Sequence, residues 1–352
     1  MHKSPLPLFW TASGIEFCTD ATSCYIEVES DYGMMEQWIR VEVDDFTMIR
    51  MPLHKGRSKI CVFHDLAAGC RRKVNLWKEV QPMGQDPDSV LLIHSIEING
   101  SLLDLPPKAC RLEFIGDSIT SGEGLAGAAT MTEDWAPIIF SCKEHYGMLT
   151  AKALNADFHI ISQSGWGVCA SWDNVPTNVI PPYYSQVCGV LTGEKNRELG
   201  AFEENDFSWQ PDVVMVNLGT NDGGAFENPP YTDPETGIEY KLRMTEDGGF
   251  EPESVQRFET AVYDFLKQLR MRNPKATILW LYGMIGTPLE EFILETLERY
   301  RKDCNDDHVE YLRLPEIREE WEGAHHHPGV IHHHKVAEVL TAKLKTLQIH
   351  PL

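Results

Sequence analysis

In the last two thirds of the chain, two kinds of segment alternate, and this alternation constrains the fold most tightly. Short apolar runs, among them 213–216 and 278–281, alternate with segments that carry apolar residues at helical spacing. A strand that is apolar on both faces must be covered on both faces, as in a parallel sheet between two layers of helices. This alternation predicts a three-layer α/β/α domain with a mostly parallel, five-stranded sheet. The strands are expected at 111–115, 158–162, 212–218, 277–282 and 309–314, and the main helices at 146–154, 254–272, 288–302 and 335–347.

The first part of the chain has a different pattern, in which polar and apolar residues alternate over short runs. In 38–44, for example, three apolar residues face one way while Arg40 and Glu42 face the other. Several such runs with turn residues between them are typical of a β-sandwich. Because Pro106-Pro107 stiffens the chain, we place the domain boundary there. The predicted domains are residues 1–107, a β-sandwich, and residues 108–352, the α/β/α domain.

Small and polar residues follow the predicted parallel strands. Ser118 comes after the first strand, Ser164-Gly165 after the second and Asn221 after the third, and His327 precedes the last helix. Ligands bind beyond the C-terminal ends of such strands, so these side chains are expected to converge there. A serine hydroxyl needs an adjacent base and donors for an oxyanion before it can attack an ester. The order of these residues therefore predicts a serine esterase.

Four segments of the chain resemble the SGNH/GDSL hydrolase superfamily. They are 114–124, with Gly116-Asp117-Ser118 at its centre, 164–167, 217–222 and 327–328. The segment 10–17, together with 98–100 and 106–107, resembles carbohydrate esterase family 2, whose members carry a jelly-roll domain before the SGNH domain. The resemblance covers nearly the whole chain. It implies an esterase, similar to acetylxylan esterases, that removes acetyl groups from sugar hydroxyls through an acetyl-serine intermediate.

The resemblance also implies roles for individual residues. Ser118 is expected to be the nucleophile, and His327 the base that takes its proton and returns it to the leaving sugar oxygen. The backbone N–H groups of Ser118 and Gly165 and the side-chain amide of Asn221 are expected to form the oxyanion hole.

Two further residues are candidate substrate contacts. Trp166 lies between the two glycines of the second segment, where its ring could stack on a pyranose. Asp117 lies beside Ser118, although its position suits a hydrogen-bond acceptor that braces the loop better.

The sequence departs from the superfamily at the residue that would orient the base. An aspartate usually lies two or three residues before this histidine, and here those positions hold His325 and Ala324. Three alternatives follow. A backbone carbonyl accepts the imidazole N–H of His327, which is the alternative we favour; Glu322 or Glu320 turns toward it; or the neutral imidazole of His325 orients it.

The composition bears on partners and location. The chain has 31 Lys and Arg against 53 Asp and Glu, a formal charge of −22, which disfavours nucleic acid and anionic membranes. We therefore expect a small-molecule or oligosaccharide substrate.

The histidines at 325–327 and 332–334 lack the spacing of a zinc protease, so no metal or cofactor is expected. No apolar leader is evident and the nine cysteines are scattered, which favours a cytoplasmic location, or a secreted one if the start is truncated.

Two other functions remain open at this point. One is a short-chain lipase or lysophospholipase of the same superfamily. The other is a carbohydrate-binding protein with an inactive SGNH domain, which the missing aspartate makes conceivable.

Overall fold

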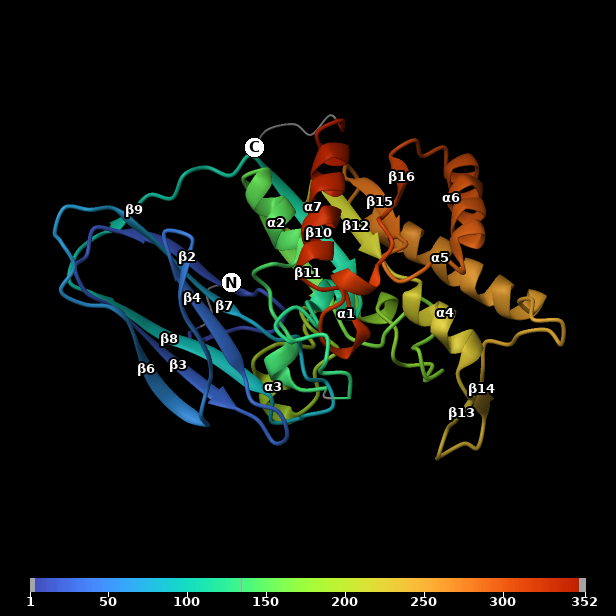
Figure 1. Cartoon of the computed structure of the whole chain (residues 1–352), viewed down its shortest axis with the longest axis horizontal. Helices are drawn as coiled ribbons and strands as arrows, with labels where there is room; N and C mark the ends of the chain where they lie inside the picture. Colours follow the sequence, from blue (N-terminus) through green and yellow to red (C-terminus); the bar gives the residue numbers. More distant parts are fainter. Residues whose placement is uncertain (1–3, 134, 348–352) are drawn as a thin grey trace. The chain divides into compact units, whose positions relative to one another are not determined.

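The computed structural model describes residues 4–133 and 135–347, and they form two compact units (Figure 1). The first unit contains the described residues up to Pro107 together with two later segments, Glu133–Lys143 and Ser185–Asn205. The second contains Lys108–Thr132, Glu144–Tyr184 and the described residues from Asp206 onward.

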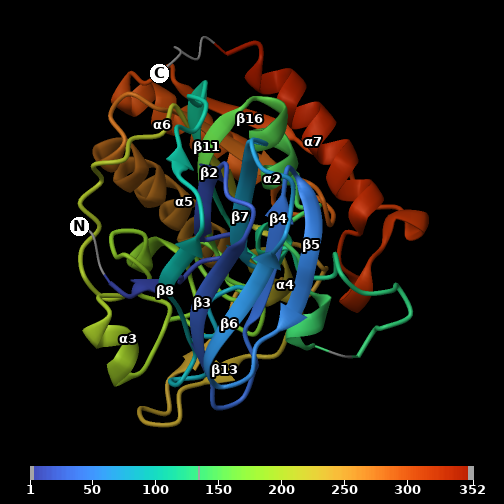
Figure 2. The same cartoon turned by 90° about the vertical axis from the view of Figure 1, so that its left-hand side faces the viewer.

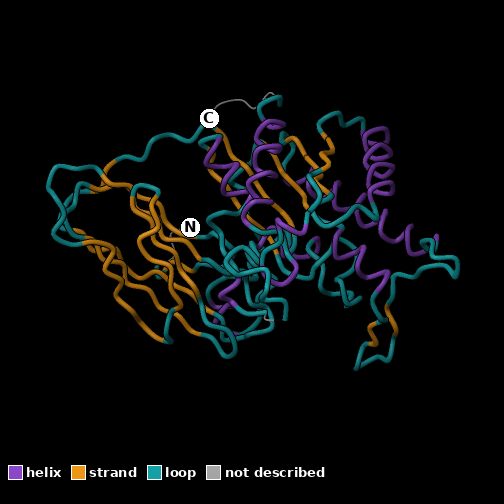
Figure 3. The backbone as a smooth tube through the Cα atoms, viewed as in Figure 1, coloured by secondary structure: helices purple, strands orange, loops and turns teal. Residues whose placement is uncertain are grey.

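The first unit is built around two antiparallel sheets, and strands dominate its secondary structure (Figure 3). One sheet has the order β1-β8-β3-β6 and the other the order β5-β4-β7-β2-β9. Alternate residues of β3, such as Ile26 and Val28, are buried, which matches the predicted period of two and the predicted sandwich. The strands are β1 (Leu6–Pro7), β2 (Gly14–Thr19), β3 (Cys24–Asp31), β4 (Trp38–Val43), β5 (Phe46–Pro52), β6 (Gly56–Phe63), β7 (Arg72–Lys78), β8 (Val90–Ile98) and β9 (Leu102–Leu103).

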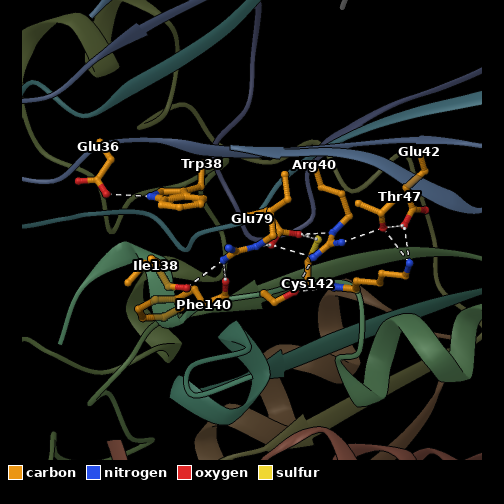
Figure 4. Close-up of polar contacts among 12 residues, drawn as sticks. Glu36, Trp38, Arg40, Glu42, Thr47, Glu79, Ile138, Phe140 and Cys142 are labelled. Carbon is orange, nitrogen blue, oxygen red and sulfur yellow. Dashed lines mark hydrogen bonds and ion pairs between the residues drawn. The ribbon is translucent and has the colours of Figure 1, made fainter. Parts of the chain in front are cut away.

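A buried ion-pair network joins one sheet of this unit to the segment Glu133–Lys143 (Figure 4). The carboxylate of Glu79, which is fully buried, accepts hydrogen bonds from Arg40 Nε at 2.6 Å and Arg50 Nε at 2.8 Å. Arg50 also donates to the backbone carbonyls of Ile138 and Phe140. Burial alone would raise the pKa of Glu79, but the two guanidinium groups outweigh it and lower that pKa.

The second unit contains a five-stranded parallel sheet with the order β11-β10-β12-β15-β16. The chain leaves β10 on one side to form β11 and returns to the other side to form β12, so the strand order reverses at β10. In open parallel sheets, ligands bind beyond the C-terminal ends of the strands at such a reversal. The strands β10 (Cys110–Gly116), β11 (Ala156–Ser162), β12 (Val213–Asn217), β15 (Thr277–Tyr282) and β16 (Val309–Arg313) lie within two residues of the predicted runs.

Helices cover both faces of this sheet, which confirms the predicted fold class. Helices α2 and α7 pack together on one face, and α5 and α6 pack together on the other (Figure 1 and Figure 2). The helices are α1 (Ser118–Ser121), α2 (Tyr146–Ala153), α3 (Glu194–Glu198, in the first unit), α4 (Thr220–Glu227), α5 (Pro252–Arg272), α6 (Glu290–Cys304) and α7 (Val330–Leu344). The long polar excursion after α4 contains a short hairpin, β13 (Tyr231–Thr232) and β14 (Glu239–Tyr240).

Within the described residues, none of the helices combines the length and apolar character that crossing a membrane requires. The cytoplasmic location stays a prediction.

Candidate active site

Ser118 lies at a sharp turn between β10 and α1. The strand ends at Gly116, and α1 begins at Ser118 with the Asp117 carboxylate accepting the N–H of Ile119 at 3.0 Å. A Cβ atom at Gly116 would overlap the side chain of Thr120, so this turn requires glycine. The turn holds Ser118 at the first position of the helix, beyond the C-terminal end of β10.

The structure brings His327 to Ser118 across 209 positions of sequence. Nε2 of His327 lies 2.8 Å from Oγ of Ser118, and Nδ1 lies 2.6 Å from the backbone carbonyl oxygen of His325. A carbonyl oxygen can only accept, so the hydrogen of the neutral imidazole is on Nδ1. Nε2 is therefore free to accept the hydrogen of the Ser118 hydroxyl, as a general base must.

An unusual backbone conformation directs the carbonyl of His325 toward His327. His325 and His326 both adopt the left-handed region, with φ of 55° and 56°. This conformation is costly for residues other than glycine and is maintained only where its surroundings enforce it. Here the N–H of His325 donates to the carbonyl of Met131 at 2.7 Å. The conformational cost therefore falls on His325, the residue whose carbonyl contacts His327.

The two glutamates considered as orienting acids lie elsewhere. A carboxylate oxygen of Glu322 is 3.9 Å from Nδ1 of His326, and Glu320 is an exposed residue of a 3-10 helix, Glu319–Trp321. The imidazole of His325 stacks parallel to that of His327, with ring centroids 5.6 Å apart, so its carbonyl and not its ring contacts Nδ1.

The acid next to the base is Glu123, which sequence reasoning missed. Its side chain is 2% exposed and accepts hydrogen bonds from Ser164 Oγ at 2.6 Å and His325 Nδ1 at 2.7 Å. The carboxylate oxygen that accepts from His325 also lies 3.7 Å from Nδ1 of His327. Burial alone would raise the pKa of Glu123, but the His327 imidazole and the two hydrogen bonds outweigh it and lower that pKa. Glu123 is therefore an ionised, buried carboxylate.

The signal for Glu123 was present in the sequence. It is a charged residue between Gly122 and Gly124 in a segment that otherwise carries small or apolar residues after Ser118. Both glycines adopt positive φ, 77° and 83°, so the loop turns sharply on each side of the glutamate. A Cβ atom on Gly124 would lie 2.7 Å from Cβ of His327, which shows how closely this loop approaches the base.

Of the expected oxyanion donors, Gly165 lies on the loop after β11, and Asn221 lies in the first turn of α4, which follows β12. Gly165 has φ of 78°, and a Cβ atom there would lie 2.9 Å from the ring of Trp172. Nδ2 of Asn221 donates to the Asp117 carboxylate at 3.2 Å and to the carbonyl of Trp166 at 3.1 Å. Both amide hydrogens of Asn221 thus have acceptors within the protein.

A second buried carboxylate, Asp222, holds the loop that contains Gly165. It accepts the backbone N–H groups of three consecutive residues, Val168, Cys169 and Ala170, at 2.7–3.0 Å. Burial raises the pKa of Asp222 to about 6, although these hydrogen bonds act in the opposite direction. Asp222 lies in the segment 217–222, and the sequence predicted no role for it; in the structure it holds the loop after β11 in place.

The two candidate substrate contacts differ in exposure. Asp117 is fully buried, and burial raises its pKa to about 7, with further contributions from the negative charges of Asp222 and Glu123. Its carboxylate braces the loop and has no surface for a substrate. Trp166 is half-buried beside Tyr183, and Trp172, next to Gly165, is 51% exposed.

Glu123, His325 and His327 are also a group that could hold a metal ion, because one ligand atom from each lies within 4.8 Å of the others. Nδ1 of His325 is hydrogen-bonded to the Glu123 carboxylate, and Nδ1 of His327 to the carbonyl of His325. An ion bound through these Nδ1 atoms would replace the contacts that set the tautomer of His327.

Known proteins are similar to this chain in sequence and in fold. Residues 112–340 match the family described as GDSL-like Lipase/Acylhydrolase. An acetyl xylan esterase from the rumen bacterium Butyrivibrio proteoclasticus has a solved structure with a TM-score of 0.96, 40% sequence identity, and coverage of 98% of this chain and 92% of that one. A family two carbohydrate esterase from Clostridium thermocellum, solved in complex with cellohexaose, has a similar fold, with a TM-score of 0.77 and 24% identity over 96% of this chain and 93% of that one.

Two characterised relatives extend the comparison. An acetylxylan esterase / glucomannan deacetylase from Cellvibrio japonicus is 24% identical over 90% of this chain and 76% of its own length. The cellulase/esterase CelE from Acetivibrio thermocellus is 27% identical over 96% of this chain. This chain spans 37% of the length of CelE.

Proposed function

Because this chain belongs to the GDSL-like lipases and acylhydrolases, within the SGNH/GDSL superfamily and similar to carbohydrate esterase family 2, we propose that it removes acetyl groups from sugar hydroxyls of oligosaccharides. The observation that carries the proposal is the geometry of His327, with Nε2 at 2.8 Å from Oγ of Ser118 and Nδ1 held by a carbonyl. That geometry supports transfer of the serine proton in the direction that acyl transfer needs.

The proposed reaction has two halves. Oγ of Ser118 attacks the acetyl carbonyl carbon while its proton passes to Nε2 of His327, and the carbonyl oxygen becomes an oxyanion. When the intermediate collapses, the bond to the sugar oxygen breaks and His327 gives its proton to that oxygen. Water then attacks acetyl-Ser118 with His327 as base again, and acetate leaves as Ser118 recovers its proton.

We assign the oxyanion to the N–H groups of Ser118 and Gly165 and to the amide of Asn221. The Ser118 N–H lies at the N-terminus of α1, where backbone N–H groups have no partner within the helix. Asn221 would exchange one of its two present acceptors for the oxyanion. Such a donor contributes when charge develops on the substrate oxygen.

Charge and surface chemistry support an oligosaccharide as the proposed substrate. A chain with a formal charge of −22 favours a neutral substrate over a polyanionic one. Trp172, half exposed beside Gly165, offers an aromatic face to a sugar ring, and Trp166 lies in the same loop. The similarity to acetyl xylan esterases points in the same direction.

Release of acetate from acetylated xylo-oligosaccharides and gluco-oligosaccharides tests the proposal. The wild type is expected to release acetate with or without EDTA, since the steps above use no metal, and S118A is expected to release none above background. Equal release by S118A would contradict the proposal.

Two further measurements separate the alternatives. A preference for nitrophenyl octanoate over nitrophenyl acetate would favour the short-chain lipase. Glycan binding without any hydrolysis or reaction of Ser118 with a serine-directed phosphonate would favour the inactive binding protein.

A further inference from the structure

We infer that Glu123 is the positioning acid of this active site, holding the base and the oxyanion loop together and compensating the positive charge that the base acquires. The inference rests on the proposed function, because it assigns a role in that reaction. Glu123 takes the role of the aspartate that is absent before His327, although it lies near the other end of the domain in sequence.

The contacts of Glu123 carry the argument. One buried carboxylate joins two loops, since it accepts from Ser164 on the loop after β11 and from His325 on the segment before α7. A carboxylate accepts only, so the hydrogen of the His325 imidazole is on Nδ1. The ring of His325 is thereby fixed, and with it the residue whose carbonyl orients His327 at 2.6 Å.

The charge of Glu123 acts on His327 directly. When Nε2 takes the proton of Ser118, the imidazole becomes a cation whose Nδ1 lies 3.7 Å from a carboxylate oxygen. The carbonyl of His325 accepts the Nδ1 hydrogen but carries no net charge, so it cannot balance that cation. An opposite charge at this distance, 2% exposed and shielded from water, stabilises the cation more strongly than it would in solvent.

Glu123 also acts on the oxyanion side of the site. Ser164, whose hydroxyl it holds at 2.6 Å, immediately precedes Gly165, the expected oxyanion donor. A single side chain therefore fixes the distance between the base and the donor loop, which is what productive geometry requires.

The titratable groups that face Glu123 set how the test must be read. His325 and His327 face it from the segment before α7. Asp117 faces it from the start of α1, where the charge of Glu123 contributes to raising the pKa of Asp117 to about 7. Removing the charge of Glu123 therefore acts on Asp117 as well, and D117N must be profiled beside it.

The test is the pH dependence of kcat/KM for nitrophenyl acetate in E123Q, which keeps the shape and one of the two acceptor oxygens but removes the charge. We expect kcat/KM to fall between about tenfold and a thousandfold, less than the roughly 10⁴-fold loss when a directly bonded triad acid is replaced. We also expect the acid limb of the profile to move to lower pH by about one unit, because the protonated base loses its counter-charge. The same move is expected when the substitution is made in the D117N background.

Two variants serve as controls. Glu113 is a buried glutamate of β10 that accepts a hydrogen bond from Tyr184 at 2.7 Å. E113Q therefore makes the same substitution at a buried glutamate that does not contact His327, and it is expected to keep the acid limb of the wild type. S164A removes one hydrogen bond of Glu123 but leaves its charge. It is expected to lower kcat without moving the acid limb.

An unchanged kcat/KM and an unchanged acid limb in folded E123Q would overturn the inference. Should E123Q not fold, E123D gives the answer, since it keeps the charge: turnover is expected to fall with the acid limb in place, and a displaced limb contradicts the role. The proposed function fails separately, if the wild type does not release acetate or S118A does.

Discussion

Asn221, the proposed oxyanion donor, is positioned by groups that would also compete with that role. Its two amide hydrogens are bonded to the Asp117 carboxylate and to the carbonyl of Trp166. These bonds fix the orientation of the amide before a substrate arrives, which lowers the reorganisation that the reaction requires. To displace one of these two acceptors, the oxyanion must accept a hydrogen bond more strongly than that acceptor does, and its full negative charge allows this.

Replacing Asn221 by alanine is therefore expected to lower kcat by about 10²–10³-fold with a small change in KM, because the donor is used in the transition state. Steady-state kinetics with nitrophenyl acetate measure this. The buried Asp117 would lose a hydrogen-bond partner in the variant, so circular dichroism must accompany the assay. A loss confined to KM would mean that Asn221 binds the ground state instead.

Individual residues were predictable where local sequence carries them. Ser118, Gly165 and Asn221 each lie directly after a buried strand, and His327 directly before a helix, so pattern and resemblance point to the same positions. Glu123 was missed because its partners are remote, Ser164 at 41 positions and His325 at 202. The position of Glu123 between two glycines marks it in the sequence, but contacts of that kind have no periodicity from which its partners could be predicted.

At the level of elements, two buried histidines join α2 to α7. Nδ1 of His145 accepts the N–H of Gly147 at 3.0 Å and so caps α2, while Nδ1 of His333 accepts the N–H of Tyr146 at 3.1 Å. Burial lowers the pKa of His145 to about 3 and also lowers that of His333. Both are therefore neutral in the folded protein over a wide range of pH.

The free energy of unfolding is consequently expected to fall on acidification. Below about pH 6.5 the unfolded chain binds a proton at His145 that the folded chain does not bind until about pH 3. In H145N the asparagine can keep the cap but does not titrate. Between pH 7 and pH 5 this variant is expected to lose roughly 2 kcal/mol less of its free energy of unfolding than the wild type.

Urea denaturation at the two pH values gives this difference, and H54N, which replaces an exposed histidine, is the control. Equal losses in H145N and the wild type would show that His145 is protonated in the folded protein.

These histidines also explain where element prediction stopped short. The last helix was expected from residue 335, but α7 begins at Val330 because His332 and His333 are buried members of its first turn. Histidines at 332–334 gave no apolar stripe from which to predict a helix. By contrast each strand of the parallel sheet contains a run of apolar residues, and the bounds of these strands were predicted closely.

At the level of the whole molecule, the course of the chain is less simple than two consecutive domains. The segments Glu133–Lys143 and Ser185–Asn205 belong to the first compact unit although both follow Pro107 in sequence. The first is held there by Arg50 and the buried Glu79 network (Figure 4). Sequence composition changes once, at the prolines, so it contains no signal for these returns.

A fragment that begins at Lys108 is therefore expected not to fold stably, because both returning segments would lose the unit they pack into. Expression of the fragment, with circular dichroism and an esterase assay, measures this. A folded, active fragment would show that the predicted boundary at 107/108 separates independent domains.

The account depends most on Ser118 being the residue that takes the acyl group. The direct measurement is peptide mapping by mass spectrometry after reaction with a serine-directed fluorophosphonate, in parallel with the acetyl esterase assay. We predict that Ser118 carries the label, and that label and activity are lost together in S118A. Full activity in S118A, or a label on a different residue of the active wild type, would contradict the account.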